Sequence, residues 1–284
     1  MGANAARRQA LASGADLTLP GEKRVAIAGD WEAHQPSAFA IVDRIAQTAP
    51  DVSTILHLGD LTVNAPVRLT GSSKRIWLHG GFIPNLDTKL GEAGIERLLL
   101  TPGNHDDWKL LAPRFAQHPD QPYLLTPRIW VLPRGYRFTL NGRSFLSFGG
   151  AVSVDKDAPP EEAPTDTDVN AAAAGGPVEV LLTHEPPNAG VEPVENVIRR
   201  GRGAWNAERL ALSAESRARI TELQHHTRPR LTFHGHIHVE GCATSADGSS
   251  TLSLDVSRHA PGASGRNAGL LDLDRLQFDW LEMG

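Results

Sequence analysis

The feature that most constrains the fold is a short apolar run followed at once by polar residues that can bind metals. It recurs five times along the chain. The runs and their polar ends are "RVAIAGD" (24–30), "TILHLGD" (54–60), "RLLLTPGNHD" (97–106), "VEVLLTH" (178–184) and "RLTFHGHIH" (230–238). Continuous apolar runs of this length are typical of strands buried on both faces of a sheet.

The segment between the first two runs predicts a helix. Residues 37–49 carry apolar side chains at helical spacing, at Phe39, Ile41, Val42, Ile45 and Ala46. The order strand, helix, strand favours an α/β fold with a largely parallel sheet. Ligands of such sheets bind beyond the carboxyl ends of the strands, so we expect the polar clusters to meet there.

The later segments predict a second sheet, packed on the first. "YRFTLNGRSFLSFGG" (136–150) is typical of a β-hairpin, because Asn141-Gly142 favours a type I′ turn. Further antiparallel strands are expected near 251–254, 270–273 and 277–280. Residues 206–227 predict a helix that could lie over the site.

The N-terminal end and one interior stretch are expected to be less ordered. Residues 1–22 are small, polar and aperiodic, which predicts a flexible N-terminal tail before a folded domain over 23–284. Residues 155–177 are acidic and rich in Pro, Ala and Gly, which predicts a mobile surface loop.

Composition excludes several functional classes. The formal net charge of −5 disfavours binding to nucleic acid, because such binding needs a basic surface. No apolar run reaches the roughly 18 residues of a membrane span, and the N-terminus lacks a signal-peptide core. The single cysteine, Cys242, cannot form an internal disulfide. We therefore expect a cytoplasmic protein; its oligomeric state is left open.

The five polar clusters indicate a metal site only when they are taken together. A single Gly-Asp pair after a strand is usually a turn, and a lone histidine is usually structural. Together, however, the clusters supply carboxylates, an amide oxygen and imidazoles, which match the ligands of two divalent metal ions. Such ions lie about 3.5–4 Å apart in phosphoryl-transfer sites.

With these motifs the sequence resembles the calcineurin-like metallophosphoesterases. The motifs of that family are Asp-x-His, Gly-Asp, Gly-Asn-His-Asp/Glu, a lone His and Gly-His-x-His. The resemblance covers about residues 24–280 and is strongest to actinobacterial and phage-type members. The Asp-Arg-Gly signature of the protein phosphatase branch is absent, since "GDLTVNAP" (59–66) stands there. The family fold is a four-layer α/β sandwich, two mixed β-sheets packed face to face and flanked by helices.

The resemblance implies a ligand at each matched motif position. Asp30 and His238 would bind the first ion, Asp60 would bridge both, and the second ion would be held by Asn104, His184 and His236. The two ions are expected to be Mn²⁺, with Fe, Zn, Ni and Mg as alternatives. His105 would act as general acid, and Asp106 would orient its imidazole.

The first motif departs from the family pattern. Glu32 stands where the family has histidine, and His34 follows two residues later. We expect Glu32 to replace the missing ligand. One alternative is a shifted loop that brings in His34, and another is that neither residue binds and the first site is weak.

The implied activity is hydrolysis of a phosphomonoester or phosphodiester by a metal-bridging hydroxide, on a small phosphorylated substrate or a nucleotide. No covalent enzyme intermediate is needed, so Ser53 and Cys242 are expected to be structural. Two sets of residues could contact substrate, although solvated surface and core packing are the simpler explanations. They are the basic Arg68, Lys74 and Arg75 and the aromatic Trp31, Trp108 and Trp205.

A non-catalytic scaffold for protein interaction is the competing hypothesis, motivated by the missing histidine of the first motif. The otherwise complete ligand set argues against it. A nuclease is disfavoured by the acidic balance.

Overall fold

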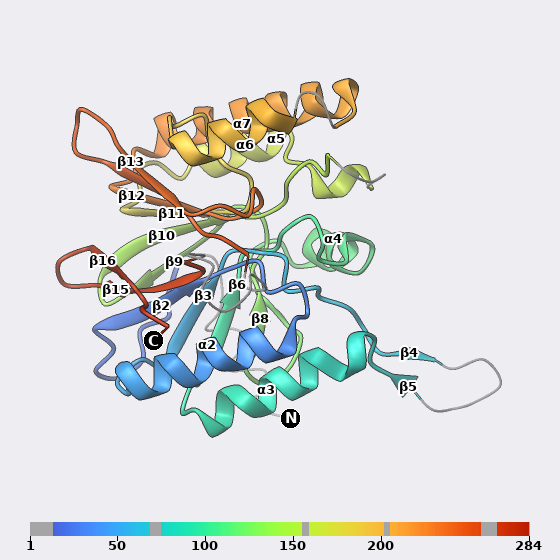
Figure 1. The fold of residues 1–284 in the computed structure, drawn as a ribbon, viewed down its shortest axis with the longest axis vertical. Coiled ribbons are helices and arrows are strands. Elements are labelled where there is room, and N and C mark those ends of the chain that lie inside the picture. Colours follow the sequence, from blue (N-terminus) through green and yellow to red (C-terminus); the bar gives the residue numbers. More distant parts are fainter. Residues whose placement is uncertain (1–13, 69–74, 155–158, 202–204, 257–265, 284) are drawn as a thin grey trace.

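Two mixed β-sheets of seven strands each form the centre of the computed structural model (Figure 1). The structure describes residues 14–68, 75–154, 159–201, 205–256 and 266–283. Helices lie on the outer face of each sheet, which makes four layers. The predicted four-layer α/β architecture is confirmed.

The first sheet holds the first three apolar runs as neighbouring parallel strands. Its order is β16 (Gln277–Trp280), β15 (Ala268–Asp272), β2 (Arg24–Ala28), β3 (Thr54–His57), β6 (Arg97–Leu100), β8 (Ile129–Val131) and β7 (Tyr123–Leu124). Ala28 pairs with His57, and His57 pairs with Leu100. Because these strands end in register, the three polar clusters that follow them leave the sheet at the same edge.

The second sheet holds the fourth and fifth runs. Its order is β1 (Ala15–Asp16), β9 (Tyr136–Leu140), β10 (Arg143–Phe148), β11 (Val180–Thr183), β12 (Leu231–His234), β14 (Ser250–Ser253) and β13 (Gly241–Thr244). The predicted hairpin is β9–β10, whose strands pair antiparallel. β10, β11, β12 and β14 are parallel neighbours, so the ends of β11 and β12 also share an edge.

The core consists of apolar side chains buried between the two sheets and beneath the helices on the outer face of each sheet. Between the sheets, aromatic rings pack closely: the centroids of Phe138 and Phe145 are 5.1 Å apart. α2 (Gln35–Thr48) turns Ile41, Val42 and Ile45 onto the first sheet. These i, i+1, i+4 positions share one helical face, as the sequence predicted.

The remaining helices cover both sheets. α3 (Phe82–Glu92) lies beside α2 on the first sheet (Figure 1), and the turn η1 (His79–Gly81) precedes it. α7 (Ala207–Thr227) covers the second sheet through Ile220 and Leu223, together with α5 (Asp166–Ala173) and α6 (Glu192–Gly201). α4 (Trp108–Gln117) begins directly after the third polar cluster. No helix in the described parts of the chain is both long and apolar enough to cross a membrane.

The expected N-terminal tail is shorter than the sequence suggested. β1 pairs with β9, and Leu17 is buried between the sheets. The buried Glu22 accepts a hydrogen bond from Arg97 at 3.2 Å, so residues 14–22 belong to the folded domain. A strand of two residues is too short to show periodicity, which is why no sign of it could be read from the sequence. Residues 1–13 lie outside the described part.

The segment expected to be a mobile loop, 155–177, contains structure of its own. After residues 155–158, which are outside the described part, come the turn η2 (Pro160–Glu162) and helix α5. α5 begins with a capping box, in which Thr165 and Asp168 exchange hydrogen bonds between side chain and backbone. This Thr-x-x-Asp start is a recognisable helix signal that the acidic composition obscured.

A small two-stranded ribbon, β4 (Val67–Arg68) and β5 (Arg75–Ile76), projects away from the sandwich (Figure 1). Of the basic residues considered as substrate contacts, Lys74 lies outside the described residues, and Arg68 and Arg75 are described by their backbone alone.

Candidate metal centre

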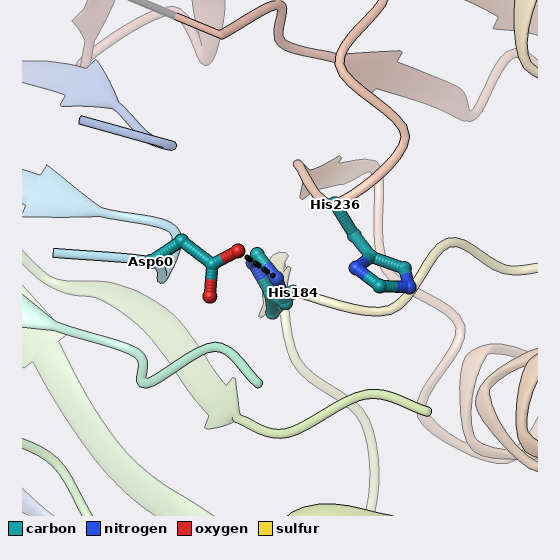
Figure 2. Close-up of side chains that lie close together, drawn as sticks. All are labelled: Asp60, His184 and His236. Atoms are coloured by element: carbon teal, nitrogen blue, oxygen red, sulfur yellow. Dashed lines mark ion pairs between the residues drawn. The ribbon is translucent and has the colours of Figure 1, made fainter. Parts of the chain in front are cut away.

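The polar ends of strands from both sheets meet in overlapping groups of side chains that could hold metal ions. One group contains Asp60, His184 and His236 (Figure 2) and another contains Asp30, Asp60 and His238. Within each group the possible ligand atoms lie within 4.8 Å of one another. Asp60 is common to both groups, which is the placement that a bridging ligand needs.

The backbone at this edge is held in an uncommon conformation. Five of the residues there have positive φ angles: Asp30 (49°), Glu32 (44°), Asp60 (54°), His236 (70°) and His238 (53°). Residues other than glycine rarely adopt this region, and it costs of order 1–3 kcal/mol per residue. Such strain persists only where the surrounding structure enforces it. Here the positive φ angles direct side chains from several turns toward the same cluster.

Two motif glycines are required by close approach. A Cβ atom on Gly103 would lie 2.3 Å from Oδ1 of Asp60. One on Gly235 would lie 2.1 Å from Oδ2 of Asp30. Both distances are far below van der Waals contact, so any larger residue would displace a carboxylate of the cluster. The glycines therefore allow the loops to pack against the acids.

Asp30 provides a test of whether a cation fits. Its side chain is fully buried, and Oδ1 accepts a hydrogen bond from the backbone N–H of His236 at 3.1 Å. His238 Nε2 lies 3.5 Å from the same oxygen. Oδ2 is buried and has no hydrogen-bond partner among the described residues. An unsatisfied buried carboxylate oxygen is costly, and a divalent cation would satisfy it.

His184 is held as a ligand would be. Its Nδ1 donates to the Leu58 carbonyl at 2.6 Å, since a carbonyl can only accept. This leaves Nε2 facing Asn104 Oδ1 at 2.9 Å and Asp60 Oδ2 at 3.3 Å. Burial would lower the pKa of His184, but the Asp60 carboxylate outweighs burial and raises it to about 10. A metal ion at this position would take the place of that proton.

The side-chain amide of Asn104 is oriented by hydrogen bonds to residues outside the metal-binding groups. Its Nδ2 donates to Ser153 Oγ at 2.8 Å, and Ser153 Oγ donates to the buried Glu162 at 2.8 Å. Because Nδ2 is engaged there, Oδ1 faces the cluster. Sequence reasoning missed Ser153 and Glu162, which follow β10 in a segment without a motif.

A third group joins Glu32 to Asp60 and His105, again with ligand atoms within 4.8 Å. Glu32 Oε1 lies 3.5 Å from His238 Nε2. His34, by contrast, is exposed at the start of α2, where its Nδ1 is 2.8 Å from Ser37 Oγ. Of the two candidate residues in the first motif, Glu32 lies in the cluster and His34 lies outside it.

Asp106 contacts different groups from those expected. Its Oδ2 accepts hydrogen bonds from the N–H groups of Gly103 (2.7 Å) and Asp60 (3.1 Å), and its Oδ1 accepts one from Val63 (2.8 Å). Burial, with the Asp60 charge, raises its pKa to about 7 although the N–H donors oppose this. Among the described residues it makes no hydrogen bond to the imidazole of His105. The expectation that it orients His105 is therefore corrected: it ties together the second and third motif loops.

His105 itself stays at the cluster through its backbone. Its N–H donates to Asp60 Oδ1 at 2.7 Å, and the residue as a whole is partly buried. The imidazole therefore lies beside Asp60.

The three tryptophans are packed in the structure. Trp31 is fully buried and donates to Asn267 Oδ1 at 3.0 Å, and Trp108 donates to the Gly103 carbonyl at 2.7 Å. Trp205 packs over Gly201 at the end of α6. Trp31 and Trp108 thus support the motif loops, which favours the packing explanation for both.

The comparisons with known proteins agree with this geometry. A family model described as calcineurin-like phosphoesterase matches residues 23–240. No curated protein matches the chain in sequence. The fold is similar to that of TT1561 from Thermus thermophilus, with a TM-score of 0.52 and 13% identity over 92% of this chain and 99% of that chain. It is also similar to a dimetal phosphatase from Danio rerio, with a TM-score of 0.52 and 12% identity over the same shares.

Proposed function

The chain belongs to the calcineurin-like phosphoesterase family, and from this premise we propose that it is a hydrolase of phosphomonoesters or phosphodiesters that uses two divalent metal ions. The observation that carries the proposal is the position of Asp60, which is shared by all three groups of possible ligands. The substrate class that fits is a small phosphorylated compound, such as a nucleotide. A cytoplasmic location and the phage-type resemblance stay predictions of the sequence.

The side chains suit oxygen-preferring cations. Asp30, Glu32 and Asp60 would supply three carboxylates, and Asn104 an amide oxygen, beside the imidazoles of His184, His236 and His238. Hard oxygen donors favour Mn²⁺ or Mg²⁺ over Zn²⁺, whereas imidazoles favour transition metals. Mn²⁺ satisfies both preferences, and we propose it as the natural metal.

The proposed chemistry divides between the cations and the chain. Bound divalent ions would polarise the phosphoryl oxygens and lower the pKa of a water molecule that attacks phosphorus. Asp60 and Asn104 would hold the cations, and in this way they would fix the position of the reacting phosphoryl group. His105 would donate a proton to the leaving oxygen, because its ring lies beside Asp60 and the residue is only partly buried.

A non-catalytic scaffold remains the second candidate, because Glu32 replaces a histidine of the family pattern. Its weakness is that every other ligand type is present and that Glu32 itself lies 3.5 Å from His238. A scaffold would have no use for a row of strained residues that direct ligands to one point.

The test is turnover by chelator-treated protein supplied with Mn²⁺, Mg²⁺, Zn²⁺ or Ni²⁺. p-Nitrophenyl phosphate reports monoester hydrolysis, and bis-p-nitrophenyl phosphate reports diester hydrolysis. We expect turnover that depends on added metal and is highest with Mn²⁺. Asp60→Asn is the matched control, since it removes the shared carboxylate with little change of volume. Absence of turnover with every metal, or turnover that persists in Asp60→Asn, would overturn the proposal.

A further inference from the structure

A buried glutamate that the proposed chemistry does not use lies directly behind the metal centre. Glu185 follows His184, at the end of β11, and its side chain is fully buried. Its Oε1 lies 3.8 Å from Nε2 of His236. Both atoms are buried, and neither has a hydrogen-bond partner among the described residues. A movement of about 1 Å would bring them within hydrogen-bonding distance.

The orientation of His236 explains why this contact matters. Figure 2 shows one ring nitrogen of His236 on the side of His184 and the other turned away. The nitrogen near Glu185 is Nε2, so Nδ1 is the one available to a metal ion beside Asp60 and His184. When it is ionised, the Glu185 carboxyl only accepts hydrogen bonds. A proton on Nε2 therefore leaves the lone pair of Nδ1 free for the metal.

The glutamate is itself held in place from two sides. Its Oε2 accepts a hydrogen bond from the N–H of Val152 at 2.9 Å, in the segment after β10. On the other side, Ser216 and, more weakly, Arg217 of α7 favour the charged form of the Glu185 carboxyl. Arg217 is buried and pairs with Glu195 of α6 at 2.6 Å. The contact behind His236 is therefore connected to the helices that cover the second sheet.

The fold alone does not account for a carboxylate here. A fully buried acid costs stability even with Val152 and Ser216 beside it, and an apolar side chain of similar volume would avoid this cost. We propose that Glu185 positions His236, fixing its ring and tautomer so that Nδ1 binds the second metal ion. This inference rests on the proposed metal centre and concerns a residue that would not touch the substrate.

The variant Glu185→Gln separates this role from simple packing. The side-chain oxygen of Gln can keep the bond from Val152, which turns its NH₂ group toward His236. That NH₂ favours a lone pair on Nε2 and a proton on Nδ1, the tautomer that cannot bind the metal. Mn²⁺ binding to metal-free protein, measured by titration calorimetry, should show one of two sites weakened by about 10- to 100-fold. The other site should be unchanged within about threefold.

A matched control is Glu22→Gln, which makes the same change at a carboxylate that is 4% exposed and pairs with Arg97, away from the metal centre. It should lower the unfolding temperature and leave Mn²⁺ affinity as in the wild type. In a His236→Ala background, Glu185→Gln should cause no further loss of affinity, because both changes disable the same ligand. Additive losses would contradict the positioning role.

The outcomes distinguish this inference from the proposed function. If the wild-type protein binds no Mn²⁺, the proposed metal centre is wrong. If the wild type binds two ions and Glu185→Gln binds both equally well, the centre stands and the role of Glu185 is wrong. Should Glu185→Gln fail to fold, Glu185→Asp carries the same expectation, since its shorter side chain keeps the charge but moves it away from Nε2. Wild-type affinity in Glu185→Asp would also overturn the inference.

Discussion

The Nε2 atom of His238 lies 3.5 Å from Oε1 of Glu32. Glu32 stands two residues after Asp30, where the family pattern has histidine. Its contact with His238 shows that the carboxylate lies beside another residue of the proposed first metal site. With Asp30 and Asp60, the proposed site would then place three carboxylates against two divalent cations. One net positive charge would remain, rather than the two expected with a neutral histidine.

The first prediction concerns the ligand role of Glu32. Glu32→Ala removes a carboxylate that lies close to His238 and Asp60, so it should weaken the first of two Mn²⁺ ions by about 10-fold or more. Titration calorimetry of the metal-free protein measures this. His34→Ala is the matched control, because His34 is exposed at the start of α2. The assignment passes to His34 if that variant loses the ion and Glu32→Ala keeps it.

The second prediction concerns the charge of the proposed site. Glu32→His restores the family ligand and removes a negative charge, so bound cations would be stronger Lewis acids and would lower the pKa of an attacking water. The limb of the pH–rate profile on which activity rises with pH should therefore move to lower pH. Profiles of kcat with Mn²⁺ for the wild type and the variant test this. A profile that stays in place, or moves to higher pH, would show that the carboxylate does not set the acidity.

The third prediction separates catalysis from binding at His105. His105→Ala should lower kcat by about 10² and leave the Mn²⁺ content unchanged, as expected for loss of an acid catalyst. The loss should be smaller for a substrate with a good leaving group, such as a p-nitrophenyl ester, than for an alkyl ester, whose leaving oxygen needs the proton more. Elemental analysis gives the metal content. Loss of one ion from the variant would instead identify His105 as a ligand, in line with its place near Glu32 and Asp60.

The fourth prediction follows from the corrected role of Asp106. Asp106→Asn replaces one carboxylate oxygen with an NH₂ group that faces an N–H donor, so at least one of the three backbone bonds is lost. At pH 8, where the native carboxylate is mostly ionised, the free energy of unfolding should fall by about 1–3 kcal/mol. Urea unfolding of the metal-free protein measures this. Unchanged stability would mean that Asp106 does not hold the motif loops.

Much of the arrangement could be predicted because it follows from periodic and local signals. The five apolar runs became buried strands, and the helix predicted over 37–49 is α2, Gln35–Thr48. Parallel strands that end in register, as Ala28 and His57 do, bring the polar clusters to the same edge. That step needs only sheet geometry, so the meeting of Asp30 and Asp60 could be expected from the sequence.

Other features depend on contacts between distant residues and carry no local signal. The burial of Leu17 between the sheets, the Ser153 contact to Asn104 and the bonds of Asp106 to backbone N–H groups are of this kind. Glu185 is an intermediate case, since its place directly after a predicted ligand could have drawn attention. A pattern of ligand types cannot show which groups stand behind the ligands, because those partners are brought together by the packing of the two sheets.

The last prediction concerns acid stability and the buried His57. This residue ends β3 with its ring against Trp31, at a centroid distance of 4.7 Å, and is fully buried. Neither ring nitrogen has a hydrogen-bond partner in the described parts of the chain. Burial lowers its pKa to about 3, from 6.5 in the unfolded chain. Between these values the unfolded state binds the proton and the native state does not, so stability falls as the pH drops below 6.5.

His57→Leu removes this proton linkage. Between pH 7.5 and 5.5 the wild type should lose about 1.4 kcal/mol more of its free energy of unfolding than the variant does, the contribution of one site with this pKa difference. Urea unfolding of both metal-free proteins at the two pH values measures the difference, and comparing them cancels other titrating groups. His225→Leu, on the exposed surface of α7, is the control and should follow the wild type. An equal pH dependence in His57→Leu and the wild type would mean that His57 is protonated, or reached by water, in the native protein.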